Sequence, residues 1–366
     1  MEQSFSSHAI APAAVLRGEG AWSEALPRIR ALCSRPLLLG RSTSTSRLRH
    51  HLKADLSAAG LAPASAELRF DCCERDLTHL RLEAQPCDAV IAAGGGKVLD
   101  AGKLLAHRLS LPCITVPLSA ATCAGWTALS NIYSPEGAFE SDVSLNRCPD
   151  LLVFDHTLVR QAPPRTLASG VADALAKWYE ASVSSADSSD GLVQQAVQMA
   201  RVLRDQLLID SPAAMEDINS PAWVRTAEAC ALTAGVMGGL GGARCRTVAA
   251  HAVHNGLTQL PACHDALHGE KVGFGILVQL RLEERMGGNR LAAQAHRQLL
   301  PLLRQLGLPV CLDDLGLAQA SLSDLQQVCS FACRDGSDLH HLPFSVTPGA
   351  LLEALVGAAE PSPLHS

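Results

Sequence analysis

Four side chains in the second half of the sequence could together bind a metal ion. Asp173 lies in the apolar segment 169–180, where a buried carboxylate is costly unless a positive group meets it. His251 and His254 are three residues apart, a spacing that places both on one helix face, and His268 starts a further helical segment. Carboxylates and imidazoles are common ligands of divalent transition metals. One buried histidine is more often a core residue and Asp173 alone could offset a helix dipole, so the group as a whole indicates the metal site.

A run of three glycines in the first half could bind a phosphate group. Gly94, Gly95 and Gly96 lie between the apolar run 88–93 and an amphipathic segment that begins at Lys97. Glycine lets the backbone approach a pyrophosphate closely, and the free N–H groups at a helix start favour an anion. The run is not a GxGxxG pattern, so the usual dinucleotide fingerprint does not apply. A tight turn that binds nothing is the alternative.

The elements that would position these groups differ between the two halves of the chain. Apolar runs alternate with helical patterns up to residue 155, which predicts a parallel sheet with helices between its strands. Strands are expected at 36–40, 67–70, 88–93, 113–117 and 151–154, helices at 44–58, 73–83 and 97–108, and a hairpin at 129–145. Helices alone are expected afterwards, including 166–182, 191–207, 222–235 and 292–306. The pattern predicts an α/β dinucleotide-binding domain over 1–160 and an all-helical metal-binding domain over 161–366.

Composition and charge limit the kinds of ligand or partner that the protein can bind. The chain has 366 residues, 48% of them hydrophobic and 18% charged, which is enough apolar material for large cores. A net charge of −6 argues against nucleic-acid binding and favours a small-molecule substrate. We find no secretory signal and no run of 18 apolar residues, so we expect a cytoplasmic protein without a membrane span. The thirteen cysteines contain no CxxC motif and are expected to be reduced thiols; a homo-oligomer is compatible with the sequence but not indicated by it.

The glycine run resembles a segment of the iron-containing alcohol dehydrogenase family, in its glycerol dehydrogenase-like branch. The run continues as GGGKVLDAGK, and the similarity extends through TVPLSAAT and ALSNIY. The resemblance implies the family's two-domain architecture, shared with dehydroquinate synthase, and a bound nicotinamide dinucleotide. The cofactor-binding residues that it implies are Gly94, Gly95, Gly96, Lys97, Asp100, Leu118, Thr127, Leu129 and Tyr133.

The metal segments resemble the same family in order and context, as DALAKWYEA, AHAVHNG and HGEKV. The resemblance implies Asp173, His254 and His268 as the catalytic metal ligands. His251 and His264 are candidates for facing the substrate or for supporting the metal ligands from behind. Iron-dependent members often carry a fourth ligand, a histidine, where this chain has Lys177. Three ligands leave an open position on a catalytic ion, and the departure at Lys177 favours zinc over iron.

The substrate segments resemble two kinds of enzyme. Glycerol dehydrogenases have an aspartate where this chain has Cys123, and a thiol accepts hydrogen bonds poorly. The segment around Cys123 and Trp126 is similar instead to bacterial hydroxycarboxylate dehydrogenase, which reduces 2-oxo acids. We therefore expect reversible reduction of a small 2-oxo acid, with glycerol oxidation as the alternative. A dehydroquinate synthase-type lyase and a non-catalytic cofactor-binding protein are less favoured.

The end of the first predicted strand bears on the choice between NAD and NADP. Glycerol dehydrogenases have an aspartate where this sequence has Arg41, and an acidic side chain there binds the adenosine ribose and repels a 2′-phosphate. An arginine cannot accept those bonds and suits a phosphate. The sequence thus predicts a preference for NADP(H), with a solvated Arg41 as the alternative.

Overall fold

A six-stranded parallel sheet forms the first half of the molecule. The computed structural model describes residues 7–360. The strand order is β1-β8-β5-β4-β2-β3, and every pairing is parallel. Its strands are β1 (Val15–Gly18), β2 (Pro36–Gly40), β3 (Ala64–Glu67), β4 (Ala89–Gly94), β5 (Cys113–Pro117) and β8 (Leu151–Asp155). A separate antiparallel hairpin is formed by β6 (Leu129–Tyr133) and β7 (Phe139–Ser144).

Helices cover both faces of this sheet because its four central strands are apolar on both sides. On one face, α1 (Ala21–Leu32) and α2 (Ser46–Ala58) pack against alternate residues such as Leu38, Ile91 and Ile114. On the other face, α3 (Glu74–Glu83) and α4 (Gly96–Leu109) pack against the intervening residues, among them Leu37 and Val90. Because successive side chains along a strand point to opposite faces of the sheet, two hydrophobic cores form, one on each side.

The order of the strands creates a crevice at one end of the sheet. The chain leaves β2 through α2 towards β3, and leaves β4 through α4 towards β5, which lies in the opposite direction across the sheet. The loops after these two neighbouring strands diverge, and a ligand crevice is expected at such a switch point. Arg41 follows β2 there, and Gly95 follows β4.

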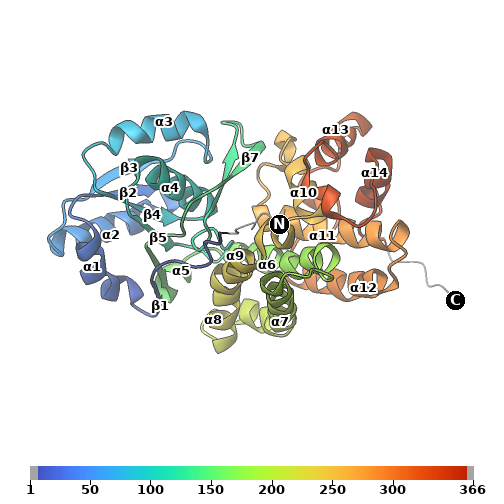
Figure 1. Cartoon of the computed structure of the whole chain (residues 1–366), viewed down its shortest axis with the longest axis horizontal. Helices are drawn as coiled ribbons and strands as arrows, with labels where there is room; N and C mark the ends of the chain where they lie inside the picture. Colours follow the sequence, from blue (N-terminus) through green and yellow to red (C-terminus); the bar gives the residue numbers. More distant parts are fainter. Residues whose placement is uncertain (1–6, 361–366) are drawn as a thin grey trace, which may run out of the picture.

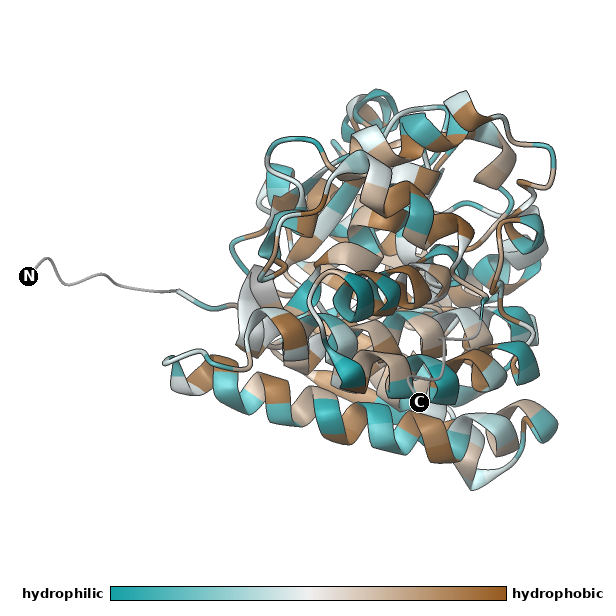
Figure 2. Ribbon diagram, turned by 90° about the vertical axis from the view of Figure 1, so that its right-hand side faces the viewer, coloured by the Kyte–Doolittle hydropathy of each residue, from teal (hydrophilic) through white to brown (hydrophobic). Residues whose placement is uncertain are grey.

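The second half is helical, as expected from the sequence, and lies beside the carboxyl ends of the strands (Figure 1). The helices are α5 (His156–Val159), α6 (Pro164–Ser184), α7 (Gly191–Glu216), α8 (Pro221–Glu228), α9 (Ala234–Arg246), α10 (Ala249–Leu257), α11 (His268–Arg285), α12 (Arg290–Gln305), α13 (Leu322–Ala332) and α14 (Pro348–Val356). The outer helices in view carry alternating hydrophobic and hydrophilic residues (Figure 2), whereas α6 and α11 are buried over most of their length.

Several elements differ from the sequence expectation, among them helix α1, which was not predicted. The edge strand β1 was not predicted, because four residues are too few to show a period. The strand expected at 67–70 lies at Ala64–Glu67, since the Asp76 carboxylate accepts the backbone N–H groups of Arg69 and Phe70 and holds them in a loop. The helix expected at 222–235 is interrupted by a π-helical turn, Ala229–Thr233, between α8 and α9.

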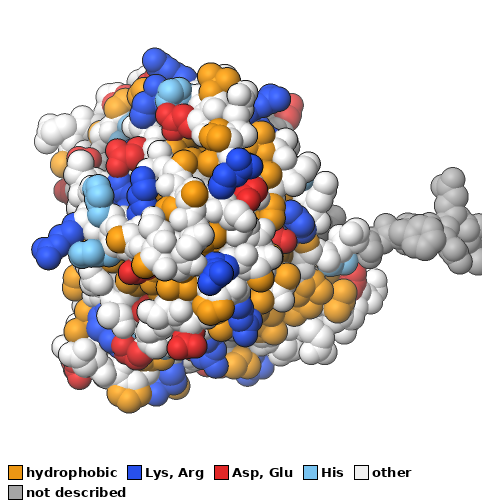
Figure 3. Space-filling model, turned by 90° about the vertical axis from the view of Figure 1, so that its left-hand side faces the viewer, with side chains coloured by type: hydrophobic (Ala, Val, Ile, Leu, Met, Phe, Trp, Pro, Cys, Tyr) orange, Lys and Arg blue, Asp and Glu red, His pale blue; other side chains and the backbone are white. Residues whose placement is uncertain are grey.

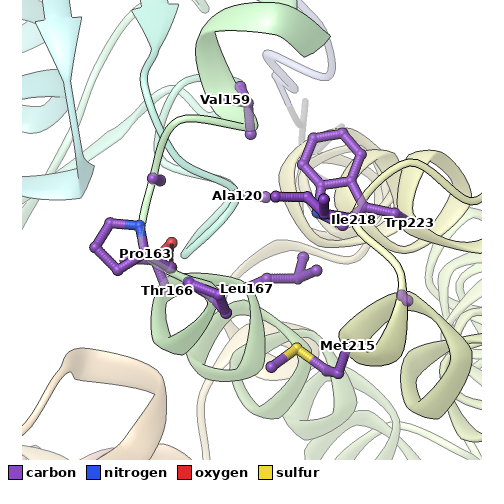
Figure 4. Close-up of a pocket in the computed structure, with 11 residues that line it drawn as sticks. Ala120, Val159, Pro163, Thr166, Leu167, Met215, Ile218 and Trp223 are labelled. Carbon is purple, nitrogen blue, oxygen red and sulfur yellow. Dashed lines mark hydrogen bonds between the residues drawn. The ribbon is translucent and has the colours of Figure 1, made fainter.

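The segment that connects the two halves packs against helices of the second half. A small apolar cavity of about 30 Å³ lies where this connection meets α6 and α8, enclosed by Pro163, Leu167, Met215 and Trp223 (Figure 4). Such a volume holds about one or two water molecules and no larger ligand, so the cavity is a packing feature of the junction. Arg17 of β1 and His156 of α5 both contact Glu228 of α8, which ties the halves together there.

The outer face of the sheet domain carries both signs of charge, with Lys and Arg side chains interspersed among acidic and hydrophobic ones (Figure 3). Within residues 7–360, no helix is both long and apolar enough to cross a membrane.

Candidate active site

One cavity of about 1010 Å³ runs from the switch-point crevice to the helical half. It is lined by all ten residues expected to bind the cofactor: Arg41, Gly94, Gly95, Gly96, Lys97, Asp100, Leu118, Thr127, Leu129 and Tyr133. Its far end is lined by Asp173, His251 and His268 from three different helices. A ligand of dinucleotide length could therefore reach from the glycine turn to these three side chains.

The glycine turn begins α4 directly after β4. Gly95 is the N-cap residue of α4, so the first backbone N–H groups of the helix face the cavity without a side-chain cap. A Cβ atom at Gly94 would lie 2.7 Å from Cβ of Val98, and one at Gly102 would lie 2.4 Å from Cβ of Ala92. These two glycines bring α4 close to β4. The helix start can thus receive an anion at short range.

A buried lysine fixes the wall opposite the glycine turn. Lys103 of α4 is 2% exposed, and its ammonium donates to the backbone oxygens of Thr127 and Leu129. It also lies 3.1 Å from Oδ1 of Asp100, whose pKa is raised by burial. Asp100 accepts the backbone N–H of Asn131 as well. One ion pair therefore holds the entry to the hairpin against α4.

The Asp173 cluster has the geometry of a metal site. Oδ1 of Asp173 is buried and has no hydrogen-bond partner, although it lies 3.4 Å from Nε2 of His251 and 3.4 Å from Nε2 of His268. Two ligand atoms about 2.1 Å from a shared ion at a tetrahedral angle are about 3.4 Å apart. The three ligand atoms all lie within 4.8 Å of one another. Lys177 Nζ also lies 3.5 Å from Oδ1 of Asp173, so this oxygen has cationic neighbours but no hydrogen bond, and its position facing two imidazole nitrogens fits a divalent cation.

Partners behind the imidazoles select the nitrogen that faces Asp173. Glu180 is fully buried, and its carboxylate accepts from Nδ1 of His251 at 2.6 Å and from the backbone N–H groups of Val248 and His251. Nδ1 of His268 lies 2.9 Å from Nε2 of His254, whose own Nδ1 lies 2.9 Å from the Asn255 amide oxygen. If His254 donates to that amide oxygen, it accepts from His268. Both ligand imidazoles then present Nε2 as a free lone pair.

The charges in the cluster are strongly coupled. Burial alone would raise the pKa of Asp173, but Lys177, His251 and His268 outweigh burial and hold that pKa well below its ordinary value. Burial would lower the pKa of His251, whereas the Glu180 carboxylate raises it, with a net value of about 9. Burial lowers the pKa of both His254 and His268. A metal ion bound here would therefore displace a proton from His251, whereas the imidazoles of His254 and His268 would already be neutral.

Two close helix contacts bring these ligands together. A Cβ atom at Gly269 would lie 1.8 Å from the Ser169 carbonyl oxygen, and the Gly269 N–H donates to the Ser169 hydroxyl. His268 precedes this contact on α11, and Asp173 lies one turn after it on α6. Arg165 at the start of α6 also forms an ion pair with Glu270. Only glycine at position 269 allows the two helices to approach so closely.

Comparison with known proteins gives the family. Residues 12–156 match the family model of iron-containing alcohol dehydrogenases. An uncharacterised oxidoreductase from Synechocystis sp. is 52% identical over 357 residues, which cover 97% of this chain and 92% of that protein. Hydroxycarboxylate dehydrogenase A from Escherichia coli is 35% identical over 293 residues, which cover 78% of this chain and 79% of that protein. The chain belongs to the iron-containing alcohol dehydrogenase family.

The fold of the family is shared over almost the whole chain. The crystal structure of a probable glycerol dehydrogenase from Sinorhizobium meliloti superposes with a TM-score of 0.85 at 28% identity, covering 96% of this chain and 98% of that one. The two-part architecture and the resemblance to the glycerol dehydrogenase-like branch are thus confirmed. As a member of this family, the protein is an oxidoreductase that acts on CH–OH groups, and the family implies a nicotinamide dinucleotide and a divalent metal ion.

Three residues expected in the active site of this family member lie elsewhere. His254 does not line the cavity and contacts His268 from behind, so the candidate metal group has His251 in its place. Both imidazoles are on one face of α10, and sequence spacing cannot tell which of them is nearer to α6. The Trp126 indole donates to the Ile10 carbonyl and packs against Gly235. His264 lies 3.1 Å from the Thr258 carbonyl oxygen and also lies outside the cavity lining.

Several cavity-lining residues were not predicted as site residues. Lys177 and Arg246 place two cations near Asp173, and Asp338 and His341 enter from a turn before α14. Lys177 is one helical turn after Asp173, a spacing visible in the sequence. The other three come from segments that approach the cavity only through the tertiary fold. No local pattern identifies them.

Proposed function

We propose that the protein catalyses the reversible, NAD(P)H-dependent reduction of a small 2-oxo acid to a 2-hydroxy acid. The observation that carries this proposal is a single cavity that is lined by the glycine turn at one end and by the Asp173 cluster at the other, with Lys177 buried beside Asp173. Cys123 lines the same wall, where the glycerol-specific members have a carboxylate. A wall with a buried ammonium group and a neutral thiol favours an anionic substrate over a neutral polyol.

The side chains have separate parts in the proposed reaction. Asp173, His251 and His268 would hold the divalent ion, zinc rather than iron because Lys177 stands at the fourth ligand position. The bound ion would supply Lewis acidity at the substrate carbonyl, and the cofactor the hydride. Glu180 keeps His251 oriented through its Nδ1, and His254 does the same for His268. The glycine turn and Lys97 bind the cofactor phosphates.

Glycerol oxidation is the second candidate. It is favoured by the similarity to the probable glycerol dehydrogenase from Sinorhizobium meliloti over nearly the full length of both chains. The similarity to hydroxycarboxylate dehydrogenase A favours the first candidate instead. Both substrates would place an oxygen at the same ion, so the residue at position 123 and the nearby charges must decide between them.

We predict that glycerol is a poor substrate. The Cys123 thiol replaces a charged hydrogen-bond acceptor, and the loss of such a bond costs about 1.5–3 kcal/mol, or roughly tenfold to a hundredfold in discrimination. The measurement is kcat/KM for glycerol and for 2-oxobutanoate, with zinc present and with both cofactors. Cys123→Asp should raise kcat/KM for glycerol by about the same factor, while Cys123→Ser should leave the order of substrates unchanged. More efficient turnover of glycerol by the wild type would make the protein a glycerol dehydrogenase.

The surroundings of Arg41 bear on the cofactor. Arg41 lines the cavity at the switch point together with Ser42, and its guanidinium forms an ion pair with Asp71. Asp71 also pairs with Lys97 of the glycine turn and is itself almost fully buried. The carboxylate therefore lies behind two cations that face the cavity. This arrangement supports the proposal that Arg41 receives a 2′-phosphate and that NADP(H) is preferred.

We predict that Arg41→Asp lowers the ratio of kcat/KM for NADPH to that for NADH by tenfold to a hundredfold, the value of a charge-assisted hydrogen bond. Arg47→Asp is the matched control, because Arg47 is exposed on α2 and does not line the cavity. It should leave the ratio within about twofold. A wild-type enzyme that favours NADH, or equal effects of the two substitutions, would remove Arg41 from the cofactor site.

A further inference from the structure

Arg246 presents an unpaired cation to the substrate end of the cavity. It is the last residue of α9, it is half-buried, and it lines the cavity. It has no ion pair and no hydrogen bond with any side chain that the structure describes, which excludes those of residues 243 and 244. The stem of the side chain lies against Gly238, where a Cβ atom would come 3.1 Å from Cδ of Arg246. A guanidinium group that is partly removed from water and lacks a partner is suited to receive an anion.

The backbone around Arg246 is fixed by the same residue that orients a proposed metal ligand. Two residues after Arg246, the Val248 N–H donates to the buried Glu180 carboxylate, which also accepts from the His251 side chain. Gly242, with φ 68°, gives α9 the sharp bend that precedes this anchor. The positions of Arg246 and of the Asp173 cluster are therefore linked through one carboxylate.

Arg246 is close enough to the other wall residues to influence them. Burial lowers the pKa of Lys177, but Asp173, Cys123 and Glu180 together outweigh burial and raise it, and Arg246 acts in the lowering direction. Burial raises the pKa of the Cys123 thiol, which both Lys177 and Arg246 oppose. The four side chains of Asp173, Lys177, Cys123 and Arg246 thus surround one part of the cavity.

We propose that Arg246 binds the carboxylate of the 2-oxo acid, with Lys177 adding positive charge behind it, while the substrate carbonyl faces Asp173, His251 and His268. This inference rests on the proposed function and names its specificity-determining residue. With a divalent ion bound, the ion, Lys177 and Arg246 outweigh the carboxylates of Asp173, Glu180 and Asp338. The substrate end is then net positive, which favours an anion over a neutral polyol.

The test compares two ketones of equal length that differ in one group. 2-Oxobutanoate has a carboxylate where 1-hydroxybutan-2-one has a neutral CH₂OH group. Arg246→Gln should raise KM for 2-oxobutanoate about tenfold to a hundredfold, keep KM for 1-hydroxybutan-2-one within about twofold, and leave kcat for that ketone nearly unchanged. Arg246→Lys should restore part of the affinity, and Arg201→Gln, at an exposed position on α7, should behave as wild type. Equal losses on both ketones, or an unchanged KM for 2-oxobutanoate, would overturn the assignment.

A separate measurement keeps this inference distinct from the proposed function. If the wild type does not reduce 2-oxobutanoate, the proposed function fails, and oxamate is then used as an inert carboxylate during turnover of 1-hydroxybutan-2-one. Competitive inhibition that weakens at least tenfold in Arg246→Gln would retain the carboxylate site, in line with a lost charged hydrogen bond. Absence of inhibition, or inhibition that is equal in the two proteins, would reject it.

Discussion

His251→Ala and Asp173→Asn should each yield a folded protein that no longer retains a divalent ion, and kcat/KM should fall by a factor on the order of 10³ or more. The reason is Oδ1 of Asp173, which has no hydrogen bond and faces Nε2 of His251 and Nε2 of His268 at 3.4 Å. His254→Ala should have a smaller effect, because His254 touches His268 from behind and a partner of that kind contributes about tenfold to a hundredfold in metal affinity or activity. Metal content, zinc affinity by chelator competition and steady-state rates measure the difference.

His79→Ala is the control for this comparison, since His79 is exposed on α3 and far from the cavity lining. It should retain the metal and the activity of the wild type. If His254→Ala lost the ion as completely as His251→Ala, the ligand set expected from the sequence would be restored. If His251→Ala kept a full complement of metal, the cluster would not be the metal site.

Gly269→Ala should destabilise the protein and weaken metal binding together. The new methyl group would meet the Ser169 carbonyl oxygen at 1.8 Å, so α11 and α6 would have to separate, and overpacking of this kind costs about 1–3 kcal/mol. The same separation would move His268 away from Asp173. We expect a lower urea midpoint of unfolding for the metal-free protein and a zinc affinity that is lower by about tenfold or more.

Gly191→Ala is the matched control, because Gly191 starts α7 and nothing lies within 4 Å of the position of an added Cβ. Its midpoint should be unchanged or slightly higher, as alanine is the better helix former. An equal stability of the Gly269→Ala and Gly191→Ala proteins would show that the close contact of α11 with α6 is not required for the fold. Reduced stability with unchanged zinc affinity would separate the contact from the metal site.

The sequence predicts those parts of the fold that have a strong local pattern of hydrophobic residues. The glycine turn lies between a fully buried strand, which appears in the sequence as a continuous apolar run, and an amphipathic helix, whose apolar residues recur at helical spacing. The strand at 64–67 was displaced in the prediction because Leu68 and Phe70 continue the apolar pattern, while the Asp76 side chain removes their segment from the sheet. Such a tertiary hydrogen bond has no counterpart in local periodicity.

The candidate site likewise consists of residues that local motifs predict and residues that only the tertiary fold brings together. Asp173 and His268 were predicted from motifs in separate segments, and the structure brings them together. The choice between His251 and His254 depends on how α10 is rotated against α6, which is set by the buried Glu180 carboxylate and by Gly275, where a Cβ would meet the Ala250 oxygen at 2.4 Å. Arg246 could not be found at all from the sequence, because its neighbours in the cavity are far away along the chain.

The contact of α6 with the sheet domain has a mechanical consequence. A Cβ atom at Gly170 would lie 1.9 Å from the Ala120 carbonyl oxygen, so helix and loop touch there without any intervening side chain. Asp173 follows less than one turn later on the same helix. If the two halves rotate relative to each other about this contact, the displacement of each group increases with its distance from the contact. Asp173, less than one turn from the contact, would move less than the cavity-lining groups that are remote from it, so a cofactor could enter and leave with little disturbance of the ligands of the ion.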